Sequence, residues 1–142
     1  MKTYNIREMT IEDFNNVIKL WKDTPGIGLS NADSNENIAK FLNKNKGLSF
    51  VCLSDNKIIG TILCSHDGRR GYIYHLTVHN NYRNTGIAKR LIMQSINMLK
   101  KSGIDKCHLF TFNDNVLGKN FWSKMDWTKR EDIIIFSKNI SK

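Results

Sequence analysis

One short stretch of this 142-residue chain combines glycine, alanine and basic residues at a spacing suited to holding an anion. Residues 83–90 read Arg-Asn-Thr-Gly-Ile-Ala-Lys-Arg and lead into an apolar pattern of helical period. Gly86 and Ala88 allow a tight turn that brings backbone N–H groups inward at a helix start, where the helix dipole adds partial positive charge. Such a helix start favours phosphate, and the basic side chains would add full charges. A tight strand-to-helix turn with a solvated basic surface is the plainer alternative.

A second group of residues, just before this stretch, could transfer protons. His75 lies in the apolar run 72–79, and an imidazole that titrates near ~6.5 suits a general base at neutral pH. Because side chains alternate along a strand, we expect His75 and Thr77 to face away from Tyr72 and Tyr74. We therefore keep both His75 and Tyr74 as candidate catalytic residues. A packed structural histidine is the alternative for His75, in which case the two tyrosines line a substrate site.

Hydrophobic periodicity predicts the elements that must position these residues. Thr10 followed by Asp13 resembles a capping box at the start of the first helix. The expected strands are 3–7, 49–54, 58–65, 72–79, 106–112 and 133–136, and the expected helices are 11–22, 34–42, 88–103 and 116–125. This order, β-α-α-β-β-β-α-β-α-β, predicts a mixed α/β sandwich, and the length predicts a single domain over residues 1–142.

Charge and cysteine content narrow the possible partners. The 22 basic and 13 acidic residues give a net charge of +9, which attracts polyanions such as nucleic acid, anionic lipid or a phosphorylated small molecule. Cys52, Cys64 and Cys107 form no C-x-x-C pair and fall in apolar stretches, so we expect buried free thiols in a cytoplasmic protein. No apolar stretch approaches the ~18–20 residues of a membrane span, so we expect no membrane partner.

The stretch Arg83-Asn84-Thr85-Gly86-Ile87-Ala88 resembles the R-x-x-G-x-G/A signature of the GNAT superfamily, the N-acetyltransferases that use acetyl-CoA. Before it, Leu76-Thr77-Val78 resembles the end of the family's fourth strand. After it, residues 121–127 (Phe-Trp-Ser-Lys-Met-Asp-Trp) are similar to the family's F/L-Y-x-K-x-G-F run. The expected order of elements is also that of the family, so the resemblance covers nearly the whole chain.

This resemblance implies a three-layer sandwich whose mixed sheet splays after strand four. It implies acetyl-CoA as co-substrate, no metal, and direct transfer of the acetyl group to a primary amine within a ternary complex. The acceptor stays open between a small-molecule amine and a protein or peptide amine. By resemblance, the residues that bind acetyl-CoA are Leu76, Thr77, Val78, Arg83, Asn84, Thr85, Gly86, Ile87, Ala88, Lys89, Asn115 and Trp122.

Two positions leave alternatives open within that resemblance. Trp122 stands where the family usually has a tyrosine that reprotonates the departing thiolate, and an indole cannot act as an acid at neutral pH. It either packs against the pantetheine arm or leaves proton return to another group or to water. Asn115 resembles an asparagine that bonds the pantetheine arm, although a helix cap is nearly as good an interpretation. Asp33, Asp67 and His66 are weaker loop candidates for the base, with turn formation as the alternative. Asp33 could also bind a cationic amine or cap the second helix.

Three other functions compete with acetyl transfer. The chain could bind acetyl-CoA without catalysis, since its base is insecure and Trp122 replaces the usual tyrosine. It could be a basic nucleic-acid-binding module, but its lysines are spread over the whole chain, so we expect no nucleic-acid partner. A metal hydrolase built on His75 and His79 is the third, disfavoured because the chain has no H-E-x-x-H helix. We expect a monomer or a homodimer.

Overall fold

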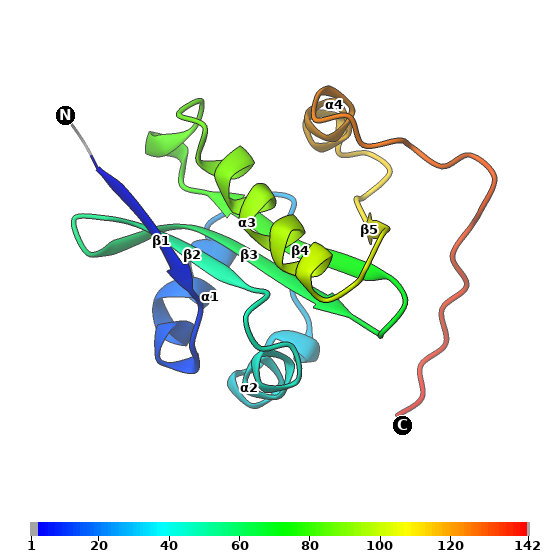
Figure 1. The fold of residues 1–142 in the computed structure, drawn as a ribbon, viewed down its shortest axis with the longest axis horizontal. Coiled ribbons are helices and arrows are strands. Elements are labelled where there is room, and N and C mark those ends of the chain that lie inside the picture. The colour runs from blue at the N-terminus through cyan, green and yellow to red at the C-terminus, as the bar shows by residue number, and fades with distance from the viewer. Residues whose placement is uncertain (1–2, 142) are drawn as a thin grey trace. The chain divides into compact units, whose positions relative to one another are not determined.

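The computed structural model describes residues 3–141, which form five strands and four α-helices (Figure 1). The strands are β1 (Tyr4–Glu8), β2 (Phe50–Ser54), β3 (Lys57–His66), β4 (Gly71–Val78) and β5 (Cys107–Leu109). The α-helices are α1 (Phe14–Lys22), α2 (Asn35–Lys44), α3 (Ile87–Lys101) and α4 (Val116–Lys124). Three short 3-10 turns, η1 (Ile11–Asp13), η2 (Asn31–Asp33) and η3 (Asn80–Tyr82), precede α1, α2 and α3. The mixed α/β class expected from the sequence is confirmed.

The strands form one sheet in the order β1-β2-β3-β4-β5. The first four are antiparallel neighbours, and β5 runs parallel to β4. The β4–β5 ladder has three residue pairs and ends at Ile73 with Leu109. Residues 74–78 of β4 therefore lie beyond the ladder, so the sheet opens between β4 and β5 as expected. The observed strand β5 is correspondingly shorter than the predicted strand 106–112.

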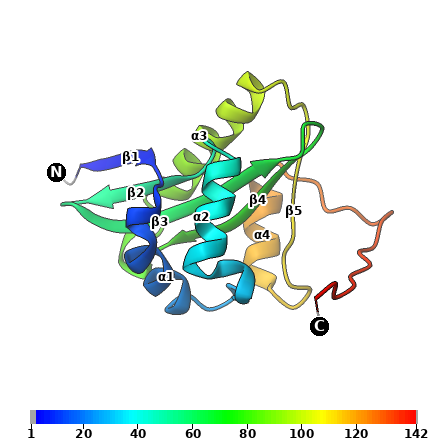
Figure 2. The same ribbon diagram turned by 90° about the horizontal axis from the view of Figure 1, so that it is seen from below.

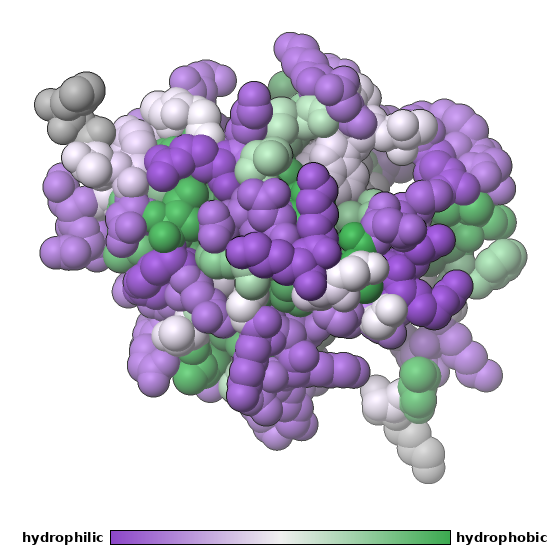
Figure 3. Space-filling model, in the orientation of Figure 1, coloured by the Kyte–Doolittle hydropathy of each residue, from purple (hydrophilic) through white to green (hydrophobic). Residues whose placement is uncertain are grey.

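Helices cover both faces of this sheet. Figure 2 shows α1 and α2 in front of the strands and α3 behind them. Trp21 and Val17 of α1 pack with Ile38 of α2 and Leu63 of β3 in one buried cluster. On the other face, α3 buries Ile87, Leu91, Ile92, Ser95 and Leu99, which recur at the spacing of one helix face. The face seen in Figure 3 is largely hydrophilic, as the charge of +9 leads one to expect.

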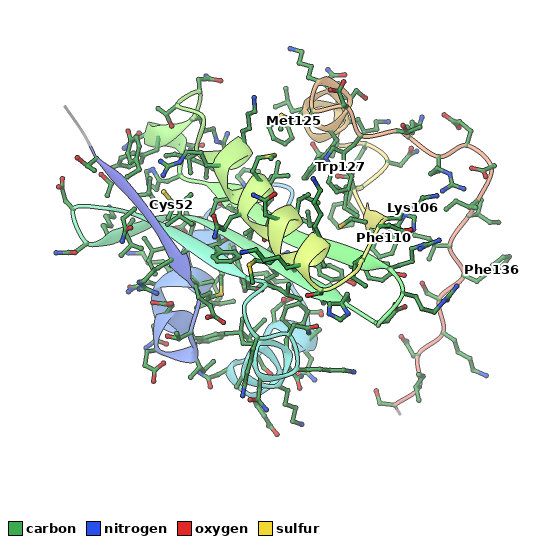
Figure 4. The ribbon with its side chains drawn as sticks, viewed as in Figure 1. Cys52, Lys106, Phe110, Met125, Trp127 and Phe136 are labelled. Carbon is green, nitrogen blue, oxygen red and sulfur yellow. The ribbon has the colours of Figure 1, made fainter. Side chains whose placement is uncertain are left out.

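The chain forms two compact units, Met1–Phe110 and Thr111–Lys142, and the second carries α4. The strand predicted at 133–136 is wrong: these residues form no strand, and Phe136, which is 88% exposed, projects from an extended segment (Figure 4). The isoleucine-rich pattern favours a strand, but a strand also needs a ladder partner, and the structure shows none for this segment among residues 3–141. The single domain over residues 1–142 stays a prediction.

Candidate functional site

The turn between β4 and α3 has the backbone geometry of an anion cradle. Gly86, the N-cap of α3, has φ of +83°, and Asn84 has φ of +62°, so two left-handed residues bracket Thr85. A Cβ atom added at Gly86 would find no atom within 4 Å, which leaves open space at the start of the helix. The first amides of α3 have no acceptor within the helix, because each would need a carbonyl four residues earlier. The turn can therefore present several N–H donors to one anion.

The backbone of β4 offers hydrogen-bonding groups on the edge where the sheet opens. The His79 N–H donates to the carbonyl of Ile59 in β3 at 2.8 Å. Because main-chain groups alternate along a strand, those of Val78 then point away from β3. The Val78 carbonyl accepts a hydrogen bond from Nε of Arg83 at 3.2 Å. The same alternation turns the main-chain groups of Thr77 toward β3, where Thr77 pairs with Thr61.

A β-bulge in β4 overturns the side-chain alternation expected there. Leu63 pairs with Tyr74 and Thr61 pairs with Thr77, so one residue of β3 lies opposite two residues of β4. His75 is one of those two, and its φ of +49° is left-handed. The Tyr74 ring meets Phe41 of α2 and the His75 ring meets Trp21 of α1, which cover the same face of the sheet. The prediction that His75 and Tyr74 face opposite ways is therefore wrong.

The His75 imidazole is held by residues from distant parts of the chain. Its Nε2 lies 2.8 Å from Oδ1 of Asp33, and the two side chains are 15% and 11% exposed. The Trp21 ring packs on the imidazole with centroids 4.7 Å apart. This association cannot be read from the sequence, because Asp33 and His75 are 42 residues apart and no local pattern links them. The only local signal was a Ser–Asp pair at capping-box spacing before α2.

Tyr74 belongs to a row of aromatic side chains on β4 and just after β5. Its ring stacks with Tyr72 at 6.5 Å and meets Phe110 at 6.5 Å, and Phe110 is 56% exposed (Figure 4). Burial raises the pKa of Tyr74, and the neighbouring Tyr72 and Cys107 raise it further. The Tyr74 phenol is therefore protonated at neutral pH, which makes it a hydrogen-bond donor and not a base.

Asn115 and Trp122 both belong to the unit that holds α4. Oδ1 of Asn115 accepts from the Gly118 N–H at 2.9 Å, so this side chain caps α4. The Trp122 ring contacts Phe121 at 5.1 Å and Trp127 at 5.0 Å between centroids. Both residues therefore have local packing or capping roles, and their predicted contact with a cofactor stays a prediction.

The weaker loop candidates form turns. Oδ1 of Asp67 accepts from the Arg69 and Arg70 amides, and Nδ1 of His66 accepts from the Gly68 amide. Nδ1 of His79 likewise accepts from the Asn81 amide at the start of η3. Within residues 3–141, no three histidine, cysteine, aspartate or glutamate side chains gather in a way that could hold a metal ion. Of the helices in that range, none has the length and apolar character that a membrane crossing requires.

Comparisons with known proteins agree on one family. Residues 14–127 match the model of the Acetyltransferase (GNAT) family. The chain is 30% identical over 135 residues to an acetyltransferase of Sodalis glossinidius, covering 95% of this chain and 94% of the relative. It is 32% identical over 122 residues to an acetyltransferase of Pectobacterium atrosepticum, covering 86% of each.

Solved structures share the fold at lower sequence identity. The PaiA N-acetyltransferase of Thermoplasma acidophilum, solved with coenzyme A, superposes with a TM-score of 0.76 at 21% identity, over 87% of this chain and 88% of that one. The aminoglycoside 6'-N-acetyltransferase of Acinetobacter haemolyticus superposes with a TM-score of 0.79 at 20% identity, over 96% of this chain and 99% of that one. At these identities the likeness concerns the fold alone.

Proposed function

The chain belongs to the GNAT family of acetyltransferases and is an acyltransferase, and from that premise we propose that it acetylates a primary amine by direct attack within a ternary complex. The observation that carries the proposal is the turn at Gly86. Its left-handed backbone, open space and uncapped helix amides fit the pyrophosphate of acetyl-CoA. The net charge of +9 also favours the approach of a multiply phosphorylated co-substrate.

The residues that we propose to hold acetyl-CoA lie on both sides of this turn. The backbone amides from Asn84 to Lys89 would hold the pyrophosphate, and the side chains of Arg83 and Lys89 would add charge. The open edge of β4 would pair with the pantetheine arm, and the Val78 amide points toward that edge. The full proposed set is Leu76, Val78, Arg83, Asn84, Thr85, Gly86, Ile87, Ala88 and Lys89, with Asn115 and Trp122 added by resemblance to the family. Thr77 is left out, because its main-chain groups point toward β3 and its side chain is buried.

Acetyl-CoA supplies a thioester carbonyl, on which an amine forms the new C–N bond as the C–S bond breaks. The protein has to provide a base, because a protonated amine has no lone pair for the attack. We assign this role to His75, whose ring lies on the α1 and α2 face beside the open edge of β4. Tyr74 precedes it on the same face, and its protonated phenol would donate a hydrogen bond to charge that develops at the reacting group.

The state of the cysteines supports direct transfer without an acyl-enzyme. Burial raises the pKa of Cys64 to about 12 and that of Cys107 to about 11. Burial raises the pKa of Cys52 as well. Thiols with raised pKa values stay protonated at neutral pH and are poor nucleophiles, so we propose no covalent intermediate on this chain.

We leave the acceptor as a small-molecule or protein amine. Several proteins of this fold act on aminoglycosides, as their names state, but the charge of +9 disfavours strongly polycationic acceptors here. We further propose a cytoplasmic monomer or homodimer without nucleic-acid or membrane partners. The three free cysteines fit a reducing compartment.

A screen of amines that follows the release of the coenzyme A thiol tests the proposed function. The panel contains spermidine, kanamycin, lysine and a tripeptide with a free amino terminus, each offered with acetyl-CoA. We expect thiol release above the rate of hydrolysis with at least one amine class, and acetylated product by mass spectrometry. If no class gives product while coenzyme A binds, the protein is a binding module and the proposed activity is wrong.

A further inference from the structure

Helix α1 and strand β3 fix the position of His75. The indole Nε1 of the fully buried Trp21 donates to the Thr61 hydroxyl at 2.9 Å, and that hydroxyl donates to the His75 carbonyl at 2.9 Å. The Trp21 ring also covers one face of the imidazole. The left-handed backbone of the bulge and the orientation of the ring are therefore both held by α1 and β3.

The carboxylate of Asp33 is also fixed in position, by a hydrogen bond within its own turn. Its Oδ2 accepts from the Ser30 N–H at 3.0 Å, which closes a capping box around η2. Its Oδ1 is then left for Nε2 of His75 at 2.8 Å. One oxygen fastens the carboxylate to its own turn, and the other reaches the imidazole. The carboxylate is thus oriented by its turn, independently of the imidazole.

This arrangement decides which ring nitrogen of the neutral imidazole carries a proton. An ionised carboxylate only accepts hydrogen bonds, so Nε2 must carry the hydrogen and Nδ1 the lone pair. Within residues 3–141 no protein group hydrogen-bonds to Nδ1. The same residues contain no fully buried side-chain nitrogen or oxygen without a partner, so Nδ1 reaches solvent. The basic nitrogen is therefore open to solvent, as a base for an incoming amine must be.

We infer that Asp33 is a positioning residue for acetyl transfer, which holds His75 in the tautomer whose Nδ1 accepts the proton of the acceptor amine. The inference rests on the proposed function. The amine nitrogen bonds to the acetyl carbon, the C–S bond breaks, and the amine proton moves to Nδ1. Asp33 then faces an imidazolium and stabilises its charge. The departing thiolate is more basic than imidazole and takes the proton, so the ring returns to its neutral form.

Asp33→Asn is the discriminating variant. Its amide oxygen can still accept from the Ser30 amide, but its NH₂ group then points at Nε2 and requires the proton on Nδ1. We expect kcat/KM at pH 7, with the best amine of the panel, to fall about 10²-fold, with the affinity for coenzyme A unchanged. In ¹⁵N NMR spectra of the imidazole, Nδ1 of His75 should change from a lone-pair to an N–H shift. Combining Asp33→Asn with His75→Ala should cost no more than His75→Ala alone.

Asp13→Asn is the matched control, because Asp13 occupies the same place in the capping box of η1, where its partner is Arg7. It should keep activity within about twofold. Thermal melting verifies that both variants fold. Any one of three results would overturn the role of Asp33 and leave the proposed acetyl transfer intact. These are activity of Asp33→Asn near the parent rate, an unchanged Nδ1 shift, and a full additive loss in the double variant. A parent protein that acetylates no amine would overturn both.

Discussion

The turn at Gly86 and the surroundings of His75 are built in different ways. The turn is proposed as a main-chain site, in which amides of consecutive residues would be the donors and left-handed φ angles direct them. The His75 region is a side-chain site, assembled from α1, η2, β3 and β4. A main-chain site depends on local spacing, so it can be recognised in a short stretch of sequence. A side-chain site depends on contacts between distant residues, so it becomes visible only in the folded chain.

The largest expected effect comes from blocking the main-chain site. Gly86→Trp forces a bulky residue into a left-handed conformation and fills the open space at the helix start. We expect the affinity for coenzyme A, measured by calorimetry, to fall at least about 100-fold, which is the order of two or more lost charge-assisted hydrogen bonds.

Gly103→Trp is the control for Gly86→Trp, because Gly103 follows α3 with φ of +81° and also has no atom near its Cβ position. This variant introduces the same backbone strain at a position outside the turn at Gly86, so it should leave coenzyme A affinity nearly unchanged. Equal losses in the two variants would show that the assignment of the turn is wrong.

Removing the imidazole tests the side-chain site. His75→Ala should lower turnover about 100-fold at pH 7. The loss should be much smaller at pH 9, where more of the amine is already neutral. Coenzyme A affinity should stay the same, because the proposed contacts with coenzyme A come mainly from main-chain groups and not from the His75 side chain. His66→Ala, which alters a histidine in an exposed turn, serves as the control. An equal loss at both pH values would remove His75 from the mechanism.

The ion pair of Asp13 with Arg7, at the start of η1 and away from His75, should respond to acid. Burial favours a raised pKa for Asp13, but hydrogen bonds from Arg7 and from the Thr10 amide outweigh it and lower the pKa overall. A pKa below the unfolded value of ~3.9 gives stability that is present above that pH and is lost as pH falls through the folded pKa. Asp13→Asn should lower the free energy of unfolding by about 1 kcal/mol at pH 7, because it removes the charge that pairs with Arg7. In urea unfolding, the difference in the free energy of unfolding between parent and variant should narrow below about pH 4. A difference that stays constant with pH would contradict a lowered pKa of Asp13 in the folded state.

The smallest effect is expected at Trp122. If its role is to pack against Trp127 and Phe121, then Trp122→Phe keeps an aromatic ring there and should change kcat less than about threefold. Trp122→Tyr supplies an acidic hydroxyl group. A large rise in kcat with tyrosine alone would show that return of a proton to the thiolate limits the reaction.

Local signals explain most of what the sequence predicted correctly. Thr10 with Asp13 does form a capping box. The helical period places the buried face of α3 correctly. Each of these features depends on residues close together in the chain.

The failures have nonlocal causes. The alternation assigned to His75 fails because the bulge adds a residue to β4, which depends on pairing with β3. The pair of Asp33 with His75 brings together a loop and a strand whose separate sequences do not indicate a contact. The segment Ile133–Phe136 has the composition of a strand, but a strand also needs backbone hydrogen bonds to a neighbouring strand, which composition does not determine.

The bulge also affects how related chains can be compared. A shift of one residue in a strand moves every later side chain to the opposite face. A homologue that lacks the inserted residue could carry histidine at the aligned position and still turn it toward α3. The number of residues between Tyr74 and Val78 thus matters as much as their identity, and an alignment gap there would signal that the histidine side chain points to the other face of the sheet.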